Sequence, residues 1–300
     1  MDVLYYPGCT LKDHASSYDT SARKAAEALG VSLLEMENWT CCGTTMPLTT
    51  RLIAGLVAPA RTLIEARSAG FTELLTLCSF CYNVLKRTNH AIATDDEAKR
   101  RINAYLADEY KREGKAWQDY EAEIDVVHFL QLIRDEIGFD EVRARTRRPL
   151  AGLKVAPYYG CLLLRPHNEV GFDDPERPQV LENLLEALGC EVVDFPHKVE
   201  CCGSYLGLSS PDVAIETSFA IIQSAQNAGA NALALACPLC AYNLDARQAA
   251  MHTQLTTFPE LPIVYFTELM ALALSPEPTP VSWDRHTIDP QPLLRSVQLV

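Results

Sequence analysis

The sequence predicts an α/β fold of two repeated Rossmann-like halves, each a mostly parallel sheet with helices. Two observations lead to this prediction: the second half of the 300-residue chain echoes the first, and each half alternates short apolar runs with amphipathic stretches. That alternation is typical of strand–helix–strand units around a parallel sheet. Hydrophobic residues form 48% of the chain, which is enough for a buried core.

Five segments of the first half recur in the second. The matched pairs are YYPGC with YYGC (ending at Cys9 and Cys161), EALGVSLLEM with EALGCEVVDF, CCG with CCG (from Cys41 and Cys201), AGFTELLTLCSFCYNVLKR with AGANALALACPLCAYNLDAR, and DVVHFLQLI with PIVYFTELM. Only the second copy has a turn-rich loop, RPHNEVGFDDPERP, after Cys161, and only the first has a long polar stretch before Asp125. We expect one cysteine-rich repeat over residues 1–148, a second over 149–274, and an extended C-terminal tail over 275–300.

Each half contains four apolar runs of strand length. We expect strands over residues 3–6, 31–35, 73–77 and 125–129, and again over 154–158, 191–194, 232–235 and 263–266. Helices are expected over residues 17–29, ended by Gly30, and over 48–69, kinked at Pro59. In open α/β sheets, ligands gather at the carboxyl ends of strands, and four cysteines directly follow strands: Cys9, Cys78, Cys161 and Cys237.

The charge balance argues against nucleic acid and lipid surfaces. Lys and Arg number 26 against 39 Asp and Glu, a formal charge of -13, so no basic stripe is available for phosphates. The N-terminus has no basic region followed by a long apolar one, and no window is long enough to cross a bilayer. We expect a cytoplasmic protein that is not integral to a membrane. Eleven cysteines in a reducing compartment indicate metal ligation or redox chemistry before disulfides.

Ten of the eleven cysteines form one pattern written twice. The spacing is C-x31-CC-x35-C-x2-C in the first half and C-x39-CC-x34-C-x2-C in the second. A cubane cluster or a structural zinc site is filled by four thiolates, so a fifth cysteine indicates an enlarged or distorted cluster. Cys190, the eleventh, aligns with Val31 inside an expected strand, and we interpret it as a core residue.

Several other kinds of site could use the same cysteines. Zinc bound by four cysteines in one or both halves is the strongest of them. Disulfides are disfavoured by the reducing compartment and by the strain of a vicinal bridge, and a redox dithiol needs only one C-x2-C. Covalent haem is excluded because Tyr82 and Ala241 stand where the attachment motif needs His.

The doubled CCG and C-x2-C pattern resembles the cysteine-rich domains of the B subunit of heterodisulfide reductase over nearly the whole chain. The resemblance implies two noncubane 4Fe-4S clusters and a disulfide that is cleaved to two thiols between them. The implied ligands are Cys9, Cys41, Cys42, Cys78 and Cys81 for one cluster, and Cys161, Cys201, Cys202, Cys237 and Cys240 for the other. The same resemblance implies two partners, a ferredoxin-like iron–sulfur subunit and a flavin-containing subunit.

We therefore expect the disulfide-reducing catalytic subunit of an electron-transfer complex, acting on a small-molecule disulfide. Similar repeats occur in iron–sulfur subunits of quinone-linked glycerol-3-phosphate, lactate and succinate dehydrogenases, so such a subunit is a second hypothesis. A zinc-stabilised scaffold is a third. Four basic side chains are candidates for contact with an anionic substrate or for proton donation: His14, Arg165, His167 and Lys198.

Overall fold

Two four-stranded sheets, one in each half, form the framework of the protein. The computed structural model describes residues 1–44, 53–254, 259–277 and 280–300. The strands are β1 (Asp2–Tyr6), β2 (Ser32–Glu35), β3 (Glu73–Thr76), β4 (Asp125–His128), β5 (Lys154–Tyr158), β6 (Glu191–Val192), β7 (Ala232–Leu235) and β8 (Ile263–Tyr265). All eight strands expected from the sequence are present, and β6 is shorter than expected.

Both sheets have the same topology. Their strand orders are β2-β1-β3-β4 and β6-β5-β7-β8, and every neighbouring pair is parallel. The order reverses between β1 and β3, and again between β5 and β7. Such a reversal opens a crevice beyond the carboxyl ends of the two strands, where α/β proteins bind their ligands. The predicted α/β fold of two repeated halves is confirmed.

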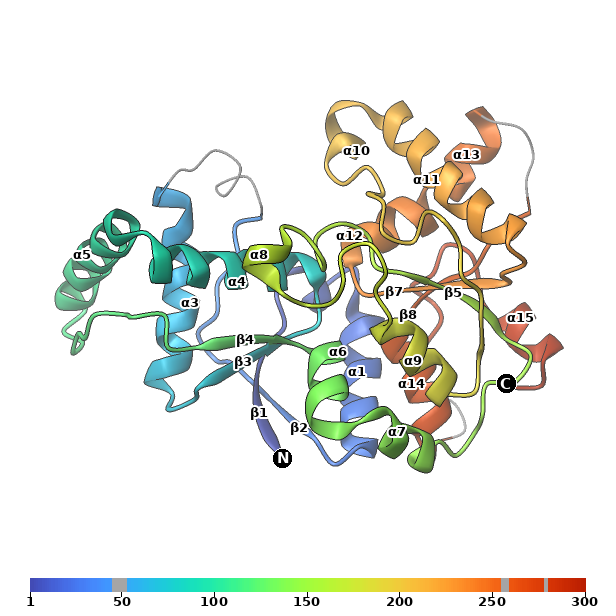
Figure 1. The fold of residues 1–300 in the computed structure, drawn as a ribbon, viewed down its shortest axis with the longest axis horizontal. Helices are drawn as coiled ribbons and strands as arrows, with labels where there is room; N and C mark the ends of the chain where they lie inside the picture. Colours follow the sequence, from blue (N-terminus) through green and yellow to red (C-terminus); the bar gives the residue numbers. More distant parts are fainter. Residues whose placement is uncertain (45–52, 255–258, 278–279) are drawn as a thin grey trace.

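Helices cover both sheets (Figure 1). They are α1 (Ser16–Ala28), α3 (Val57–Ser68), α4 (Ser79–Thr94), α5 (Asp96–Arg112), α6 (Phe129–Leu132), α7 (Phe139–Arg145), α8 (His167–Val170), α9 (Val180–Ala187), α10 (Leu206–Ser209), α11 (Pro211–Asn227), α12 (Pro238–Ala241), α13 (Gln248–Gln254), α14 (Phe266–Leu274) and α15 (Gln291–Ser296). Two π-helical segments, η3 (Ile133–Ile137) and η4 (Tyr242–Ala246), continue α6 and α12. The 3-10 segments are η1 (Thr10–Lys12) and η2 (Ile53–Leu56).

The helices expected over residues 17–29 and 48–69 correspond to α1 and α3. Helix α1 ends as expected, because Gly30 follows it with a positive φ of 75°. The helix expected over 48–69 is α3, preceded by η2, and residues 48–52 lie outside the described part. Pro59 does not kink α3: it lies in the first turn, where a proline costs no intrahelical hydrogen bond. The long polar stretch of the first half forms α5, capped by the Asp95 side chain, which accepts from two backbone amides.

The two halves exchange helix contacts across their boundary. Helix α1 of the first half packs along α14 of the second, and α6 and α7 of the first half pack on α9 of the second (Figure 1). A hydrogen bond of 2.7 Å between the hydroxyls of Ser21 and Thr267 lies in the first of these contacts. Buried residues of both halves therefore form one continuous hydrophobic core.

The C-terminal segment differs from the extended tail that we expected. Its apolar side chains Val281, Trp283 and Ile288 are buried, and α15 follows them. The Asp245 carboxylate accepts hydrogen bonds from the amides of Thr287 and Ile288, at 2.6 and 3.0 Å. The segment folds back because these apolar residues find core positions on the second half. Within the described ranges, no helix is both long and apolar enough to cross a membrane.

Candidate metal centre

The C-x2-C motifs lie at helix N-termini that follow the central strands. Cys78 follows β3 and caps α4, and Cys81 lies in the first turn of that helix. Cys237 and Cys240 take the same positions at α12 after β7. The backbone amide of Cys81 donates to Cys78, and those of Leu239 and Cys240 donate to Cys237. The motif spacing therefore places two sulfur atoms of each half at the positive end of a helix.

The CCG motifs form a tight turn that aims backbone amides at sulfur. Gly43 and Thr44 both have positive φ angles, 79° and 67°, as do Gly203 and Ser204 at 92° and 45°. Amides of Gly43 and Thr44 donate to Cys41 and Cys42, respectively, and the amide of Gly203 donates to Cys201. Successive amides in such a turn make a concavity that favours anions.

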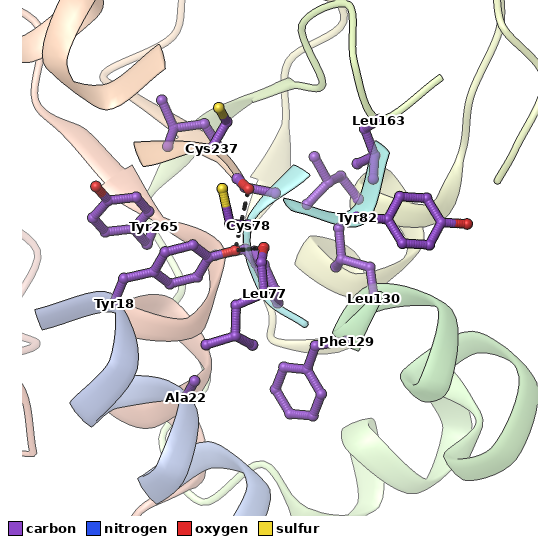
Figure 2. Close-up of a cluster of buried hydrophobic side chains, with 14 of the residues drawn as sticks. Tyr18, Ala22, Leu77, Cys78, Tyr82, Phe129, Leu130, Leu163, Cys237 and Tyr265 are labelled. Atoms are coloured by element: carbon purple, nitrogen blue, oxygen red, sulfur yellow. Dashed lines mark hydrogen bonds between the residues drawn. The ribbon is translucent and has the colours of Figure 1, made fainter. Parts of the chain in front are cut away.

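All ten cysteines of the repeated pattern form one continuous series in which each thiol neighbours the next. The Sγ atoms of Cys9 and Cys41 are 3.8 Å apart, and those of Cys202 and Cys240 are 3.4 Å apart. At the other steps each thiol affects the pKa of its neighbour, and the series runs Cys9, Cys41, Cys42, Cys81, Cys78, Cys237, Cys240, Cys202, Cys201 and Cys161. The two sets come together at Cys78 and Cys237, each of which affects the pKa of the other (Figure 2).

The thiols compete for negative charge. Hydrogen bonds from Cys41 and Cys81 lower the pKa of Cys42 to about 3, and the hydrogen bond to Cys42 contributes most to raising the pKa of Cys81. In the second half, hydrogen bonds from Cys161 and Cys202 lower the pKa of Cys201 to about 3. None of the largest influences on these pKa values is a lysine or arginine. A full set of thiolates therefore calls for cations at the sulfur atoms.

The ten thiols are candidate donors for a metal or an iron–sulfur centre. Across residues 1–44, 53–254, 259–277 and 280–300, no group of three or more Cys, His, Asp or Glu side chains is arranged to hold one metal ion. The thiols instead contact one another in succession. Several iron atoms held by several thiolates suit this arrangement, whereas zinc needs four ligands around one point.

A buried tyrosine lies against the thiols in each half, a feature that the cysteine spacing did not predict. The hydroxyl of Tyr6 donates to the carbonyl of Thr40 at 2.7 Å, and that of Tyr158 donates to Glu200 at 2.7 Å. Each acceptor directly precedes the paired cysteines. Burial first, and then the neighbouring cysteines, raise the pKa of both phenols. The signal was available, because these tyrosines belong to the matched segments YYPGC and YYGC.

The glycine before the first cysteine of each set makes room for sulfur. Gly8 and Gly160 have φ angles of 73° and 66°, where glycine is favoured. A Cβ atom on Gly8 would lie 2.9 Å from the Sγ of Cys81, and one on Gly160 would lie 3.4 Å from that of Cys240. These glycines let the C-x2-C sulfur approach the end of the first strand in each half.

A hydrogen-bond network joins the halves at the Cys78–Cys237 contact. Tyr18 donates to the carbonyl of Leu77 at 2.6 Å and approaches that of Ala236 at 3.3 Å, so it contacts the residue before each of the two cysteines (Figure 2). Ser79 donates to Ala236 through its amide and its hydroxyl. The buried imidazole of His128 contacts the Leu77 carbonyl at 2.7 Å, and burial lowers its pKa to about 3.

Two asparagines that follow the C-x2-C motifs secure the second set of cysteines. Asn243 donates to the carbonyls of Cys202 and Ser204, each at 3.2 Å. Asn83 instead crosses to the other half and donates to the carbonyls of Leu162 and Arg165, each at 2.8 Å, just after Cys161. One more residue separates the motif from Asn243 than from Asn83, and the π-helical segment η4 accommodates it.

The four basic candidates lie apart from the thiol series. Arg165 donates to Glu176 and to two carbonyls, and Lys198 forms ion pairs with Glu182 and Asp194 at 2.8 and 2.7 Å. Their charges are thus compensated by the protein, which argues against a substrate contact. His14 and His167 are exposed, and His14 pairs with Asp13. Cys190 is buried apart from the other thiols, and burial raises its pKa to about 12.

The architecture and the cysteine pattern agree with a known protein family. A family model described as a cysteine-rich domain, CCG, matches residues 3–86 and 155–245. The chain belongs to the CCG cysteine-rich domain family. Each matched segment of the CCG pattern carries one five-cysteine set.

Three individual proteins illustrate the similarity. The chain is 30% identical over 288 residues to the 8-methylmenaquinol:fumarate reductase membrane anchor subunit of Wolinella succinogenes, covering 96% of this chain and 97% of that one. It is 26% identical over 289 residues to the B subunit of a ferredoxin/F420H2-dependent CoB-CoM heterodisulfide reductase of Methanosarcina acetivorans, covering 94% and 92%. A hypothetical protein from Helicobacter pylori shares the fold, with a TM-score of 0.73 at 11% identity, over 95% of this chain and 51% of that one.

Proposed function

We propose that this protein holds two noncubane 4Fe-4S clusters and is the disulfide-reducing subunit of an electron-transfer complex. The observation that carries the proposal is the continuous series of ten thiols, in which two five-cysteine sets meet at Cys78 and Cys237. The ligands of one cluster are Cys9, Cys41, Cys42, Cys78 and Cys81, and those of the other are Cys161, Cys201, Cys202, Cys237 and Cys240.

Two clusters held by these cysteines would supply the two electrons with which a bound disulfide, on taking up two protons, is cleaved to two thiols. The protein's own groups hold this arrangement in place. Amides at the CCG turns and at the starts of α4 and α12 stabilise sulfur charge. Tyr18 and Ser79 fix the ends of β3 and β7, and with them the separation of the two sets.

Two kinds of partner follow from the proposal. Electrons have to reach this chain from outside, and we propose a ferredoxin-like iron–sulfur subunit as the immediate donor, with a flavin-containing subunit behind it. The relative from Methanosarcina acetivorans, named as a subunit of a ferredoxin-dependent reductase, supports this assignment.

A quinone-linked dehydrogenase or reductase subunit is the second candidate. It keeps both clusters and changes only the acceptor. The observation that favours it is the 30% identity, over nearly the full length of both chains, to a protein named for 8-methylmenaquinol and fumarate.

Metal analysis followed by an acceptor screen tests these proposals. Protein purified without oxygen should contain about eight iron atoms and eight sulfides per chain. Four or fewer iron atoms after reconstitution, or zinc in their place, would refute the two-cluster proposal. Reduced protein is then mixed with a panel of low-molecular-weight disulfides and, separately, with quinones. Release of two thiols supports the first candidate, whereas oxidation by quinones alone supports the second.

A further inference from the structure

A cavity that the cysteines do not line lies beside the thiol series. Its volume is about 540 Å³, within the range of sites that hold small organic ligands. The segment from Thr10 to Ser17 of the first half forms one side, and α12, η4, the end of β8 and residues 284–287 form the other. Among the described residues that line it there is no cysteine.

The cavity adjoins the second set of cysteines. Leu239 lines it and also lines the small cavity formed by Cys161, Cys202, Cys237 and Cys240. One turn of α12 therefore separates the two spaces, a distance on the order of a helix diameter, about 10 Å. On the opposite side, Thr10 follows Cys9 directly. A ligand in the cavity would lie within reach of electron transfer from the thiol-bound centre.

The walls combine apolar residues with polar and charged ones, including His14, Asp284 and Arg285, which suits a ligand with a flat apolar body and polar groups at its edge. Pro238, Leu239, Ile263 and Val264 supply apolar surface. Tyr265 is only 6% exposed, and its ring stacks on that of Tyr18 with centroids 4.1 Å apart and planes 5° apart. Figure 2 shows its hydroxyl directed away from the Tyr18 hydroxyl. A planar ring packs well against a wall that already contains stacked aromatic rings.

One wall of the cavity also holds a proton. Both ring nitrogens of His286 face acceptors: Nδ1 lies 2.9 Å from the Ile263 carbonyl, and Nε2 lies 3.0 Å from the Glu268 carboxylate. Two acceptors cannot both be satisfied by a neutral imidazole and an ionised carboxylate, because one contact would join two lone pairs. The His286–Glu268 pair therefore retains an additional proton at the cavity wall.

We propose that this cavity binds a quinone, a flat apolar carrier of two electrons and two protons. The quinone takes two electrons from the reduced iron–sulfur centres and two protons, for which the His286–Glu268 pair and water are the source, and leaves as the hydroquinone. This inference extends the second candidate function by naming the cavity in which its quinone acceptor would bind. Reduction of the quinone rests on the proposed iron–sulfur clusters, whereas binding of the quinone does not.

Binding of menadione, a water-compatible naphthoquinone, tests the proposal without turnover. Ala246 is exposed and lines the cavity, so Ala246→Trp should narrow it without disturbing the core. Ala249 is an exposed alanine three residues later that does not line the cavity, and Ala249→Trp is the matched control. Equilibrium dialysis of the full chain should show a tenfold or greater loss of menadione affinity in Ala246→Trp alone, about 1.4 kcal/mol. Both variants should retain the circular dichroism and iron content of the wild type.

The outcomes separate this proposal from the function on which it rests. Equal menadione affinity in all three proteins, or no binding by an iron-replete wild type, would overturn the cavity assignment. Specific binding that Ala246→Trp abolishes in a protein found to lack iron would uphold the cavity and refute the clusters. In iron-replete protein, the rate at which menadione reoxidises the reduced chain should fall with the affinity in Ala246→Trp.

Discussion

In the first half Cys9 and Cys41 are both exposed, whereas in the second half Cys201 is exposed and Cys161 is partly covered. The difference extends to the supporting residues. Asn243 and Ser218 both donate to the carbonyl of Cys202, while Val84 stands at the position equivalent to Asn243 when the motifs are aligned without a gap. Asn83 of the first half stabilises the loop after Cys161 in the other half. The ligand pattern is thus duplicated, but among the described residues the two asparagines and Ser218 all support the second set.

This contrast teaches that the two sets are not interchangeable. In the first set two thiols are exposed, those of Cys9 and Cys41. In the second set only Cys201 is exposed, and Leu239 of α12 separates this set from the cavity. Matched variants in the two halves test this difference.

Removing one buried ligand from either half should have the largest effect. Cys42→Ala and Cys202→Ala should each lower the iron content by about half, from about eight atoms to about four, because each cluster depends on its own thiolates. Either variant should abolish disulfide cleavage if, as proposed, each half captures one sulfur atom of the substrate. Cys190→Ala is the control and should keep its iron. Equal iron loss in Cys190→Ala would show that the ligand sets are wrong.

Alanine at the sulfur-facing glycines should affect the first half more than the second. Both positions require a left-handed backbone, at about 1–2 kcal/mol for any other residue. In Gly8→Ala the new methyl group also overlaps the Cys81 sulfur at 2.9 Å, whereas in Gly160→Ala the contact with Cys240 is 3.4 Å. Iron counts should fall further in Gly8→Ala. The reverse order would contradict the close approach of the Cys81 sulfur to the end of β1.

Both asparagine substitutions should act on the second half alone. Asn83→Ala removes the side-chain donor to the carbonyls of Leu162 and Arg165, and Asn243→Ala removes that to Ser204, while Ser218 still donates to Cys202; each loss costs about 1–3 kcal/mol. Urea unfolding should detect the loss of stability. Absorption spectra, recorded in variants that retain only one of the two proposed clusters, would show which half is affected. A change in the first set after Asn83→Ala would show that the support is shared between the halves.

Tyr18→Phe should lower stability by a smaller amount and should affect both halves. The carbonyls of Leu77 and Ala236 keep His128 and Ser79 as partners, so the loss is about 1 kcal/mol. Hydrogen exchange should nevertheless rise at the ends of both β3 and β7. Tyr5→Phe, which removes a hydrogen bond to Asp19 within the first half, is the control and should leave β7 unchanged.

The smallest expected effect is a pH dependence confined to the second half. Burial opposes the charged form of His286, but the Glu268 carboxylate outweighs it, and the pKa of His286 is raised. The stabilisation is complete below the unfolded pKa of about 6.5 and is lost as the pH rises through the folded value. Melting temperatures measured upward from pH 6 should fall more in the wild type than in His286→Gln. Parallel curves would exclude the ion pair as a source of stability.

Much of the fold and the cysteine pattern could be predicted because short stretches of the sequence are enough to identify both. Four apolar runs in each half marked the strands, and matched spacing marked ten cysteines. The supporting contacts were harder to predict, since Tyr6, Tyr158 and Gly8 act through residues distant in the chain. The charges of Arg165 and Lys198 indicated a ligand site only until their carboxylate partners were known. The C-terminal segment contained apolar residues, but its proline content favoured an extended tail.

The crosswise helix packing bears on how such a chain arose and how it can be divided. Helix α14 covers α1, and α7 covers α9, so each half completes the core of the other. A fragment that stops near residue 148 would leave α1 and α6 with bare apolar faces, and a second copy of the same fragment has equivalent faces to offer. The chain therefore resembles a two-fold dimer whose two subunits are joined in one polypeptide. Because both repeats are parts of a single chain, their loops can differ in sequence and length.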